Sequence, residues 1–426
     1  MSLVPASVLR VLDHLRSRTS TSDALRRLSP VADAAPASAL RSGRSSSADT
    51  VERMWAQILR LKPETASARE VLAPADVTAQ AEAYAGNIEN MIGVVSLPVG
   101  AIGPLRINGM HANGDFIVPL ATSEAALVAS YQRGATLIGA AGGASVAMIQ
   151  EGVLRSPGFR FRSLLEAGFF VEWVTREAQA LKATAEATTR HGKLISLEPV
   201  IDNDVVFLLC RYTTGDAAGQ NMVTIATDAL CRHIVAAAPI APLDWYIEAN
   251  FSGDKKASYL GVITGRGRKV SASVLLPGSL VRKHLHATVD EMLAYSSMAN
   301  LGSLLSGQLG AQAQYANGLA AFYIATGQDA ACVAESAVGF TRIEKRGDDL
   351  FASVTLPNIL VGSVGGGTRL PAQAAALDLM GLRGAGHGAA LAEVAATVCL
   401  CGELSIVGAI AAGHFTRAHE SLARRR

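Results

Sequence analysis

The spacing of hydrophobic residues between positions 157 and 250 predicts an alternation of short strands and amphipathic helices. Period-two runs predict strands, and longer runs with a helical period predict two helices between them. The predicted strands cover about 159–162, 191–201, 205–214 and 245–251, and the helices about 164–189 and 217–237. This β-α-β-β-α-β order is that of the split-βαβ, ferredoxin-like unit. We therefore expect an inserted small domain over 157–250.

Residues 1–86 carry a helical hydrophobic period without strand-like alternation. A short amphipathic helix and a Ser/Ala/Pro/Arg-rich linker come first. A firmer helix is predicted over 51–61, with Thr50 as its N-cap and Pro63 as its stop. Another is expected to run to Ala85. We interpret this region as an N-terminal helical arm or domain.

The remaining segments, 87–156 and 251–426, combine predicted strands with long apolar helices. No charged residue occurs between Met292 and Gln328, although Asn, Gln and Gly residues interrupt this stretch. Amide side chains are costly in lipid, so buried helices fit this stretch better than a membrane span. We expect an α+β protein in which these segments form a large, mostly helical domain, with a final helix over about 389–415.

Composition narrows the class of protein. The 426 residues carry a net charge of +2 and no long basic run, which gives no reason to expect nucleic acid. The five cysteines are odd in number and lack a Cys-x-x-Cys pair, which favours reduced thiols in a cytosolic protein. Charges interrupt the N-terminus early, so a signal segment is not predicted. We expect a soluble, cytoplasmic protein without a metal.

Three adjacent charges, Asp254-Lys255-Lys256, stand out because only 17% of the residues are charged. A lysine ammonium is a compact point charge that can stabilise a developing oxyanion, but acidic partners must hold it in place. Asp329 is the first charge after the uncharged stretch and is a candidate partner, since a buried carboxylate needs a cation or a donor. The simpler alternatives are a solvated loop and a capping aspartate.

Two glycine-containing stretches are candidate ligand sites. The loop 362–368 follows a predicted strand and precedes a helix, an arrangement that brings bare amides to a phosphate but also serves as a plain connection. Asp216 precedes the predicted helix 217–237 and would repel a phosphate, so it suits nucleotide hydroxyls or a capping role. Arg190 is better suited to a phosphate. The chain lacks the G-x-G-x-x-G fingerprint.

Glu124 and His414 are open to structural and chemical interpretations. Glu124 is predicted in the first turn of a helix capped by Thr122 or Ser123, where interaction with the helix dipole is the alternative to acid–base chemistry. His414 could donate a proton or simply lie on the surface. It is five residues from His419, a spacing that does not place both on one helix face for a metal.

Eight stretches, taken in order, resemble the hydroxymethylglutaryl-CoA reductase family, specifically the catalytic portion of its class I members. They are Glu89-Asn-Met-Ile-Gly93, Pro98-Val-Gly-Ala-Ile-Gly-Pro-Leu105, Ala121-Thr-Ser-Glu124, Asp216-Ala-Ala-Gly-Gln-Asn-Met222, Asp254-Lys-Lys256, Gly327-Gln-Asp-Ala-Ala331, Gly362-Ser-Val-Gly-Gly-Gly-Thr368 and Gly413-His414. The resemblance covers about residues 85–420. It implies a homodimer with active sites between subunits, a large domain holding the thioester and a small domain holding NADPH.

The resemblance also implies a reaction and its residues. The thioester of 3-hydroxy-3-methylglutaryl-CoA would be reduced to mevalonate with two NADPH. Lys255 would stabilise the oxyanion, Asp329 would hold Lys255, Glu124 would protonate the aldehyde oxygen and His414 the departing thiolate. Substrate contacts would come from Ser130, Arg133, Arg155, Asp254, Lys256 and Asn317. Cofactor contacts would come from Arg190, Asp216, Gly219, Asn221, Gly362, Gly365, Gly366, Gly367 and Thr368.

Some positions depart from the family pattern. Gln314 stands where a CoA-contacting histidine is common, Thr136 and His286 stand where animal enzymes have basic CoA contacts, and Gln220 replaces a methionine. These differences suggest an alternative activity, the reduction of a related acyl-CoA or carrier-bound acyl thioester. A hypothesis of a different class is a catalytically silent acyl-CoA-binding protein.

Overall fold

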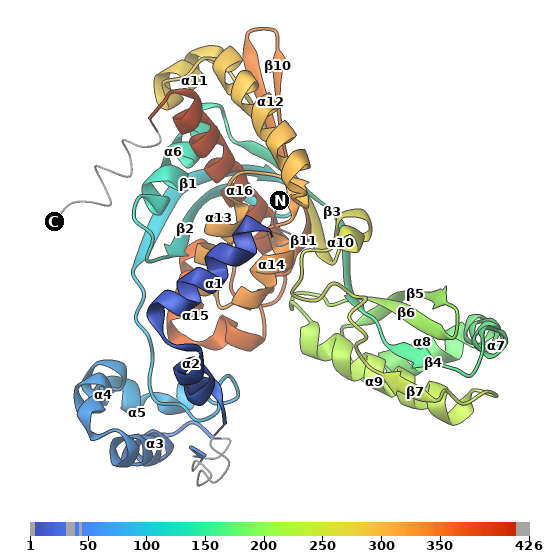
Figure 1. Cartoon of the computed structure of the whole chain (residues 1–426). Helices are drawn as coiled ribbons and strands as arrows, with labels where there is room; N and C mark the ends of the chain where they lie inside the picture. Colours follow the sequence, from blue (N-terminus) through green and yellow to red (C-terminus); the bar gives the residue numbers. More distant parts are fainter. Residues whose placement is uncertain (1–4, 31–38, 42–44, 415–426) are drawn as a thin grey trace. The chain divides into compact units, whose positions relative to one another are not determined.

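The computed structural model describes residues 5–30, 39–41 and 45–414. The contacts divide the chain into two compact units, Met1–Gly93 and Val94–Arg426. The structure contains many helices together with a mixed sheet, which confirms the α+β class predicted from the sequence (Figure 1).

Every helix or strand assigned among the described residues of the first unit is a helix. Its elements are α1 (Ala6–Arg18), α2 (Thr21–Leu28), α3 (Ala48–Leu61), η1 (Pro63–Thr65), α4 (Ala66–Leu72), α5 (Ala75–Ala79) and η2 (Ala81–Tyr84). Helix α3 ends where it was predicted to end, but its N-cap is Ser47 and not Thr50, which forms the other half of a capping box. The single helix predicted up to Ala85 is wrong, because Pro74 and short 3₁₀ turns divide that stretch into several pieces.

The second unit is built on one continuous sheet. Its strands are β1 (Val99–Gly109), β2 (Asn113–Ala121), β3 (Ala144–Arg155), β4 (Gly158–Arg160), β5 (Lys193–Asp202), β6 (Val205–Thr213), β7 (Asp244–Tyr246), β8 (Gly267–Leu276), β9 (Gly310–Ala311), β10 (Gly339–Arg346) and β11 (Asp349–Ile359). The main path runs β7-β4-β6-β3-β8-β11-β10-β9, and β5 pairs with β6. Strand β3 therefore joins the two ends of the sheet and delivers Arg155 to their junction.

The helices of this unit lie against the sheet and between its loops. They are α6 (Leu127–Ala140), α7 (Leu164–Arg176), α8 (Ala178–Glu186), α9 (Gln220–Ala237), α10 (Tyr259–Thr264), α11 (Gly278–Leu285), α12 (Val289–Ser306), α13 (Tyr315–Thr326), η3 (Ala330–Cys332), α14 (Val333–Ser336), η4 (Gly366–Arg369), α15 (Pro371–Met380) and α16 (Gly388–Ala411).

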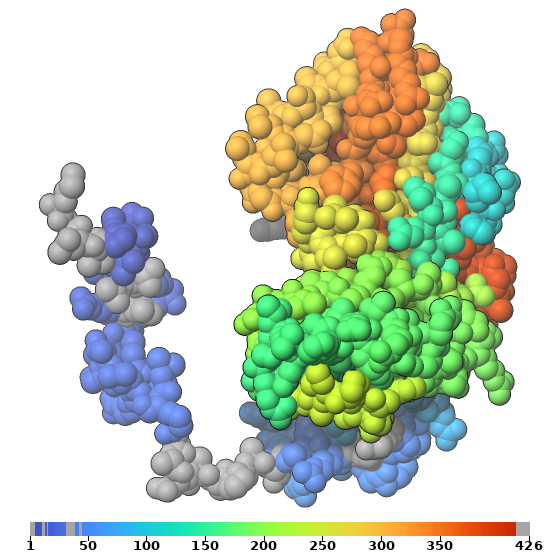
Figure 2. All heavy atoms as spheres, turned by 90° about the vertical axis from the view of Figure 1, so that its right-hand side faces the viewer, coloured from blue at the N-terminus to red at the C-terminus, as the bar shows by residue number. Residues whose placement is uncertain are grey.

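The segment 157–250 has the predicted order of elements. Its strands pair in the order β7-β4-β6-β5, and each neighbouring pair is antiparallel, as in a split-βαβ unit. Helices α7, α8 and α9 accompany this sheet, and in Figure 2 the green residues of the segment gather in one block. Two boundaries differ from the prediction. The first helix is divided at Glu177, and α9 begins at Gln220 rather than at residue 217.

Helix α16 forms the centre of the core. By length and composition it is the one described helix that could cross a membrane, but 83% of its most apolar window is buried within the protein, as expected for a core helix. It packs closely on α6, where a methyl group on Gly134 would lie 2.1 Å from the carbonyl oxygen of Cys401. Glu393, wholly buried on α16, accepts hydrogen bonds from the backbone N–H groups of His111, Ala112 and Met148.

The uncharged stretch 292–328 forms α12 and α13, and the prediction that both are buried is wrong for α12. Helix α13 is almost wholly buried, but α12 exposes Met298, Leu301, Leu304 and Leu305 by 57 to 80%. An apolar face of this kind on one chain is typical of a surface that another protein covers.

Substitution of Gly134 tests the close packing of α6 on α16. Gly134→Ala should lower the free energy of unfolding by about 1–3 kcal/mol, because the methyl group meets backbone atoms that cannot move aside. Gly168→Ala on α7 is the matched control, since its methyl group would meet no atom within 4 Å. It should stabilise the protein by up to about 1 kcal/mol through helix propensity. Equal effects in chemical denaturation would contradict this packing argument.

Candidate functional site

Lys255 and Asp329 form an ion pair between two loops. The Lys255 Nζ atom lies 2.9 Å from Asp329 Oδ2. Lys255 is in the turn that precedes α10, and Asp329 is the N-cap of η3, where its carboxylate also accepts from the Ala331 N–H group. Asp329 was expected in a buried position, but its side chain is 42% exposed because α13 ends at Gly327 and the chain emerges there. The pair is therefore open to a ligand.

The pair stabilises both charged forms. The hydrogen bond to Asp329 raises the pKa of Lys255, and the charge of Asp329 adds to this effect against partial burial. Partial burial acts to raise the pKa of Asp329, but the hydrogen bonds from Lys255, the Ala331 N–H group and Gln220, with the charge of Lys255, lower it overall. Both groups are consequently ionised at neutral pH.

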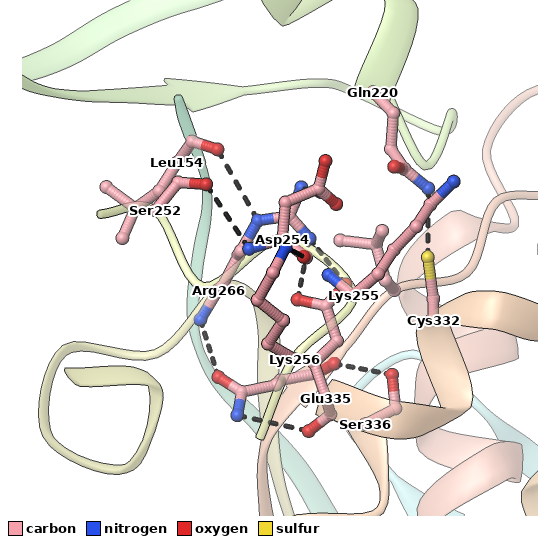
Figure 3. Close-up of polar contacts among 12 residues, drawn as sticks. Leu154, Gln220, Ser252, Asp254, Lys255, Lys256, Arg266, Cys332, Glu335 and Ser336 are labelled. Carbon is pink, nitrogen blue, oxygen red and sulfur yellow. Dashed lines mark hydrogen bonds and ion pairs between the residues drawn. The ribbon is translucent and has the colours of Figure 1, made fainter. Parts of the chain in front are cut away.

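The predicted substrate residues Arg155 and Asp254 lie together, next to Lys255. Arg155 Nη1 donates to Asp254 Oδ2 at 3.1 Å and to Glu248 Oε2 at 3.0 Å. The Arg155 side chain is only 8% exposed, so it supports the Asp254 loop directly. Lys256 is exposed, and its Nζ donates to the Asp254 carbonyl oxygen at 2.8 Å. Asp254, Lys255 and Lys256 thus form one charged loop (Figure 3), which Arg155 supports from β3.

The two glycine-rich stretches lie against each other. Ala217 and Val364 form a parallel bridge, and the Ser363 N–H group donates to the Asp216 carbonyl oxygen at 2.9 Å. Buried Arg268 donates to the carbonyl oxygens of both Val361 and Gly215, which fastens the two loops together. The predicted cofactor residues of both loops thus converge.

Asp216 does not cap α9, which begins after left-handed Gly219. Its carboxylate accepts from the N–H groups of Gly386 at 2.8 Å and Gly388 at 3.0 Å, at the start of α16. Burial acts to raise the pKa of Asp216, but these two hydrogen bonds, together with the charges of Arg268 and His387, lower it overall. The capping role left open by the sequence is therefore real, but it serves a different helix.

Bare backbone is available where the two stretches meet. Gly365 and Gly366 both have positive φ angles, and a methyl group on either would meet no atom within 4 Å. The first turn of α9, with exposed Asn221, begins beside this loop. Open amides and a helix N-terminus are suited to an anionic group.

Arg190 lies in the turn between α8 and β5. The hydroxyl of Thr189 accepts from the N–H groups of His191 and Gly192, which fixes this turn. A methyl group on Gly192 would lie 2.8 Å from Met222 Cε, so the turn packs on the first turns of α9. Within the described residues the Arg190 guanidinium has no hydrogen bond or ion pair, and it is free to bind a phosphate.

Gln328 connects the segment that contains Asp329 with the glycine loop 362–368, and sequence reasoning missed it. Its side-chain amide donates to the Gly362 carbonyl oxygen at 3.0 Å and accepts from the Gly362 N–H group at 2.8 Å. A methyl group on Gly327 would lie 2.3 Å from the Gly367 carbonyl oxygen, so the two backbones touch. Adjacency to Asp329 in the sequence was the available signal.

Gln220 approaches the ion pair from the start of α9. Its amide nitrogen lies 3.0 Å from Cys332 Sγ and 3.5 Å from Asp329 Oδ2, as Figure 3 shows for the cysteine. Gln220, which departs from the family pattern, therefore contacts the segment that contains Asp329. The buried pair Arg266 and Glu335, which lies beneath Lys255, was also missed.

The prediction that Glu124 lies in the first turn of a helix is wrong. Helix α6 begins at Leu127 after a left-handed Ala126, and the Thr122 hydroxyl accepts from the Glu124 N–H group instead of capping the helix. The Glu124 side chain is exposed and makes no hydrogen bond or ion pair with the described residues. A single chain thus does not bring Glu124 into contact with Lys255.

The other predicted substrate residues lie around α16. Arg133 donates to the Ser405 hydroxyl and carbonyl oxygens, and Ser130 shares a hydrogen bond with the same hydroxyl. Asn317 is half-buried at the start of α13. The Gln314 amide donates to the Gly402 carbonyl oxygen, so this side chain is committed to the core.

His414 follows the end of α16 and is half-buried. Its backbone N–H group donates to the Ala409 carbonyl oxygen at 2.8 Å, and its ring lies 5.7 Å from the ring of His286. The structure thus brings together two residues that the resemblance associates with the CoA end of the substrate. His419 lies outside the described residues.

Comparisons with known proteins identify a family. A family model described as hydroxymethylglutaryl-coenzyme A reductase matches residues 52–424. The 3-hydroxy-3-methylglutaryl-coenzyme A reductase of Methanothermobacter thermautotrophicus is 44% identical over 348 residues, covering 79% of this chain and 85% of the relative. That of Aeropyrum pernix is 44% identical over 349 residues, covering 80% and 83%.

Solved structures support the fold. The class II 3-hydroxy-3-methylglutaryl-CoA reductase of Streptococcus pneumoniae, solved bound to NADPH in open conformations, matches with a TM-score of 0.61. The match covers 82% of this chain and 86% of that chain, at 19% sequence identity. At this identity the likeness concerns the fold alone.

Removal of Asp329 should release Lys255. Asp329→Asn should lower the pKa of Lys255, because the hydrogen bond to Asp329 is the main cause of its elevation. The raised pKa means that the stabilisation of Lys255 is complete below its ordinary value of 10.5 and is lost as pH rises through the folded value. The lowered pKa of Asp329 means that its contribution is present above 3.8 and is lost as pH falls through the folded value.

Amine labelling as a function of pH, read by mass spectrometry of the Lys255 peptide, measures this shift. Asp290→Asn is the control, since Asp290 raises the pKa of Lys345 in the same way at a distant surface pair. That variant should change the labelling of Lys345 only. An unchanged labelling profile of Lys255 in Asp329→Asn would show that the pair is not formed in solution.

Proposed function

The chain belongs to the hydroxymethylglutaryl-coenzyme A reductase family, and we propose that it reduces the thioester of (S)-3-hydroxy-3-methylglutaryl-CoA to mevalonate and CoA with two NADPH. This reaction commits carbon to isoprenoid synthesis through mevalonate. The observation that carries the proposal is the exposed Lys255–Asp329 pair, fastened by Gln328 to a loop of open glycines. A held ammonium beside a ligand-accessible backbone suits a reduction that creates an oxyanion.

The described residues fit NADPH. Gly365 and Gly366 present open amides, the N-terminus of α9 offers a positive dipole end, and Arg190 has an uncommitted guanidinium for a 2′-phosphate. Gly219, Gly362, Gly367 and Thr368 shape the same loops, and Asn221 is exposed beside them. NADPH, when bound, supplies the hydride. Asp216 contributes by fixing the loop to α16 and not through a free carboxylate.

Lys255 performs the electrostatic step. Attack on the thioester carbon moves negative charge to its oxygen, and the ammonium stabilises that oxyanion in both reductions. Asp329 keeps the ammonium charged and limits its motion, so little reorganisation is needed when the charge develops. A single preorganised donor of this kind contributes about 3–4 kcal/mol to the transition state.

Two residues would move protons. Glu124 would protonate the oxygen of the intermediate aldehyde in the second reduction, and His414 would protonate the departing CoA thiolate so that it does not add back. The thioester's acyl carboxylate would be held by the loop that contains Asp254 and Lys256 over Arg155, with Ser130, Arg133 and Asn317 completing the substrate site. His286 beside His414 supports the assignment of this end to CoA.

A homodimer would complete the site. The Glu124 side chain has no hydrogen-bond or ion-pair partner among the described residues of its own chain, and α12 exposes four large apolar side chains. Both observations are accounted for if a second copy covers such surfaces and its Glu124 enters the site of Lys255. We propose that the three segments predicted from the sequence differ in function. Residues 1–86 would be a helical region, residues 87–156 and 251–426 would form the thioester domain, and residues 157–250 would form the NADPH domain. The buried thiols fit the reducing cytoplasm.

The alternative of a related acyl-CoA or carrier-bound acyl thioester is favoured by one observation. Gln314 stands where the family commonly has a CoA-contacting histidine. Its side-chain amide donates to the Gly402 carbonyl oxygen and is therefore not available to a nucleotide. Turnover of the CoA ester and of a carrier-bound ester, measured side by side, separates the two substrates. A catalytically silent acyl-CoA-binding protein would not oxidise NADPH with either of these two esters.

A spectrophotometric assay tests the function. NADPH oxidation should depend on added hydroxymethylglutaryl-CoA, and NADH should support a lower rate. Lys255→Ala should lower kcat by roughly a hundredfold to a thousandfold, because the oxyanion loses its donor. Lys345→Ala, a surface lysine paired with Asp290, is the control and should keep the wild-type rate. A near-normal rate in Lys255→Ala would remove the oxyanion assignment.

Complementation tests the shared site. Glu124→Gln and Lys255→Ala chains, each inactive alone, should regain about a quarter of wild-type activity when co-expressed, since half of a random mixture of twofold-symmetric dimers carries one intact site. If both residues act within one chain, every hybrid site keeps one lesion and the mixture stays inactive. Size-exclusion chromatography must show dimers in both cases.

A further inference from the structure

Lys255 is held at two points by one short segment of chain. Asp329 grips its ammonium at 2.9 Å, and six residues later Glu335 accepts its backbone N–H group at 3.1 Å through Oε1. Glu335 lies on α14, directly after the η3 turn that Asp329 caps. The side chain and the backbone of Lys255 are thus fixed by neighbouring turns.

The backbone conformation of Lys255 requires stabilisation by a hydrogen bond of this kind. Its φ angle is +57°, in the left-handed region that residues with a Cβ atom rarely adopt. The conformation turns the chain between Asp254 and Lys256, and it determines the direction in which the lysine side chain leaves the loop. Without an acceptor for the Lys255 N–H group, the turn has little reason to keep this geometry.

Glu335 is itself fixed by a buried cation. Arg266 Nη1 lies 2.6 Å from both carboxylate oxygens of Glu335, and Arg266 and Glu335 are each 1% exposed. The other end of the guanidinium forms an ion pair with Asp254 Oδ1 at 2.9 Å. The buried guanidinium therefore spans the loop from Asp254 to the carboxylate that receives Lys255, as Figure 3 shows.

The number of donors requires a carboxylate at this position. Two contacts from Arg266 and one from the Lys255 N–H group converge on the two oxygens of Glu335. A carboxylate is an acceptor at both oxygens, whereas a glutamine of the same shape replaces one of them by a donor. Burial raises the pKa of Glu335, while the charge of Arg266 opposes that shift.

We propose that Glu335, held by Arg266, is a positioning residue that keeps the backbone of Lys255 in its left-handed turn and so aims the ammonium at Asp329 and the reacting carbonyl. The inference rests on the proposed function of Lys255 and adds two residues that the sequence did not single out. Neither touches the substrate.

Glu335→Gln tests the proposal. Its kcat should fall by about tenfold to a hundredfold, as expected for a misplaced catalytic group, while the KM for NADPH stays within about twofold of wild type. Glu393→Gln is the matched control, because Glu393 is an equally buried carboxylate that accepts backbone N–H groups far along the chain from Lys255. It should lose thermal stability and keep its kcat per folded molecule.

Hydrogen exchange of the free protein supplies a readout that needs no substrate. Peptides covering residues 253–257 should exchange faster in Glu335→Gln than in wild type and in Glu393→Gln. If Glu335→Gln does not accumulate folded, Glu335→Asp replaces it, since the shorter carboxylate keeps a charge beside Arg266 but withdraws from the Lys255 N–H group. The same direction of change is expected.

The outcomes are separable. Unchanged exchange of this loop, or an unchanged kcat despite faster exchange, overturns the positioning role. If the wild-type protein does not oxidise NADPH with the thioester, the proposed function fails, and the exchange experiment still decides whether Glu335 holds Lys255. Equal loss of kcat in the two glutamine variants would assign the effect to general destabilisation.

Discussion

The ion pair between Lys255 and Asp329 is the interaction on which the rest of the site depends. It joins a loop that follows the small split-βαβ unit to the end of a buried helix, and its geometry requires both to be fixed. The segment from Gly327 to Glu335 meets that requirement. Within nine residues it holds the Lys255 ammonium, the Lys255 backbone and, through Gln328, the glycine loop.

Buried charges in this chain serve to hold loops. Arg268 fastens the two glycine-rich stretches, Arg266 and Glu335 support the lysine loop, and Glu393 accepts three backbone N–H groups around β1 and β3. A buried ion pair is weak evidence for stability, because desolvation offsets most of the attraction. Its value here lies in geometry, since each pair fixes backbone that has few side chains of its own.

The surface of one chain is consistent with an incomplete site. Glu124 has no side-chain partner among the described residues, and α12 presents leucine and methionine side chains to solvent. An exposed glutamate is ordinary, but four large apolar side chains gathered on one exposed helix are typical of a surface that another protein covers. In the homodimer that we propose, a second copy would cover the apolar face of α12, and Glu124 of one copy would approach Lys255 of the other.

The sequence by itself determined the α+β class, the order of elements from β4 to β7 and the stretches that carry chemistry, because hydrophobic period and glycine placement are local properties. It did not determine where α6 and α9 begin, since Ala126 and Gly219 adopt left-handed conformations that only packing selects. Nor did it reveal that Asp216 caps α16, that Gln328 clasps Gly362 or that Glu335 receives the Lys255 amide. Those contacts join residues from 34 to 172 positions apart. Only the tertiary structure brings such donors and acceptors within hydrogen-bonding distance.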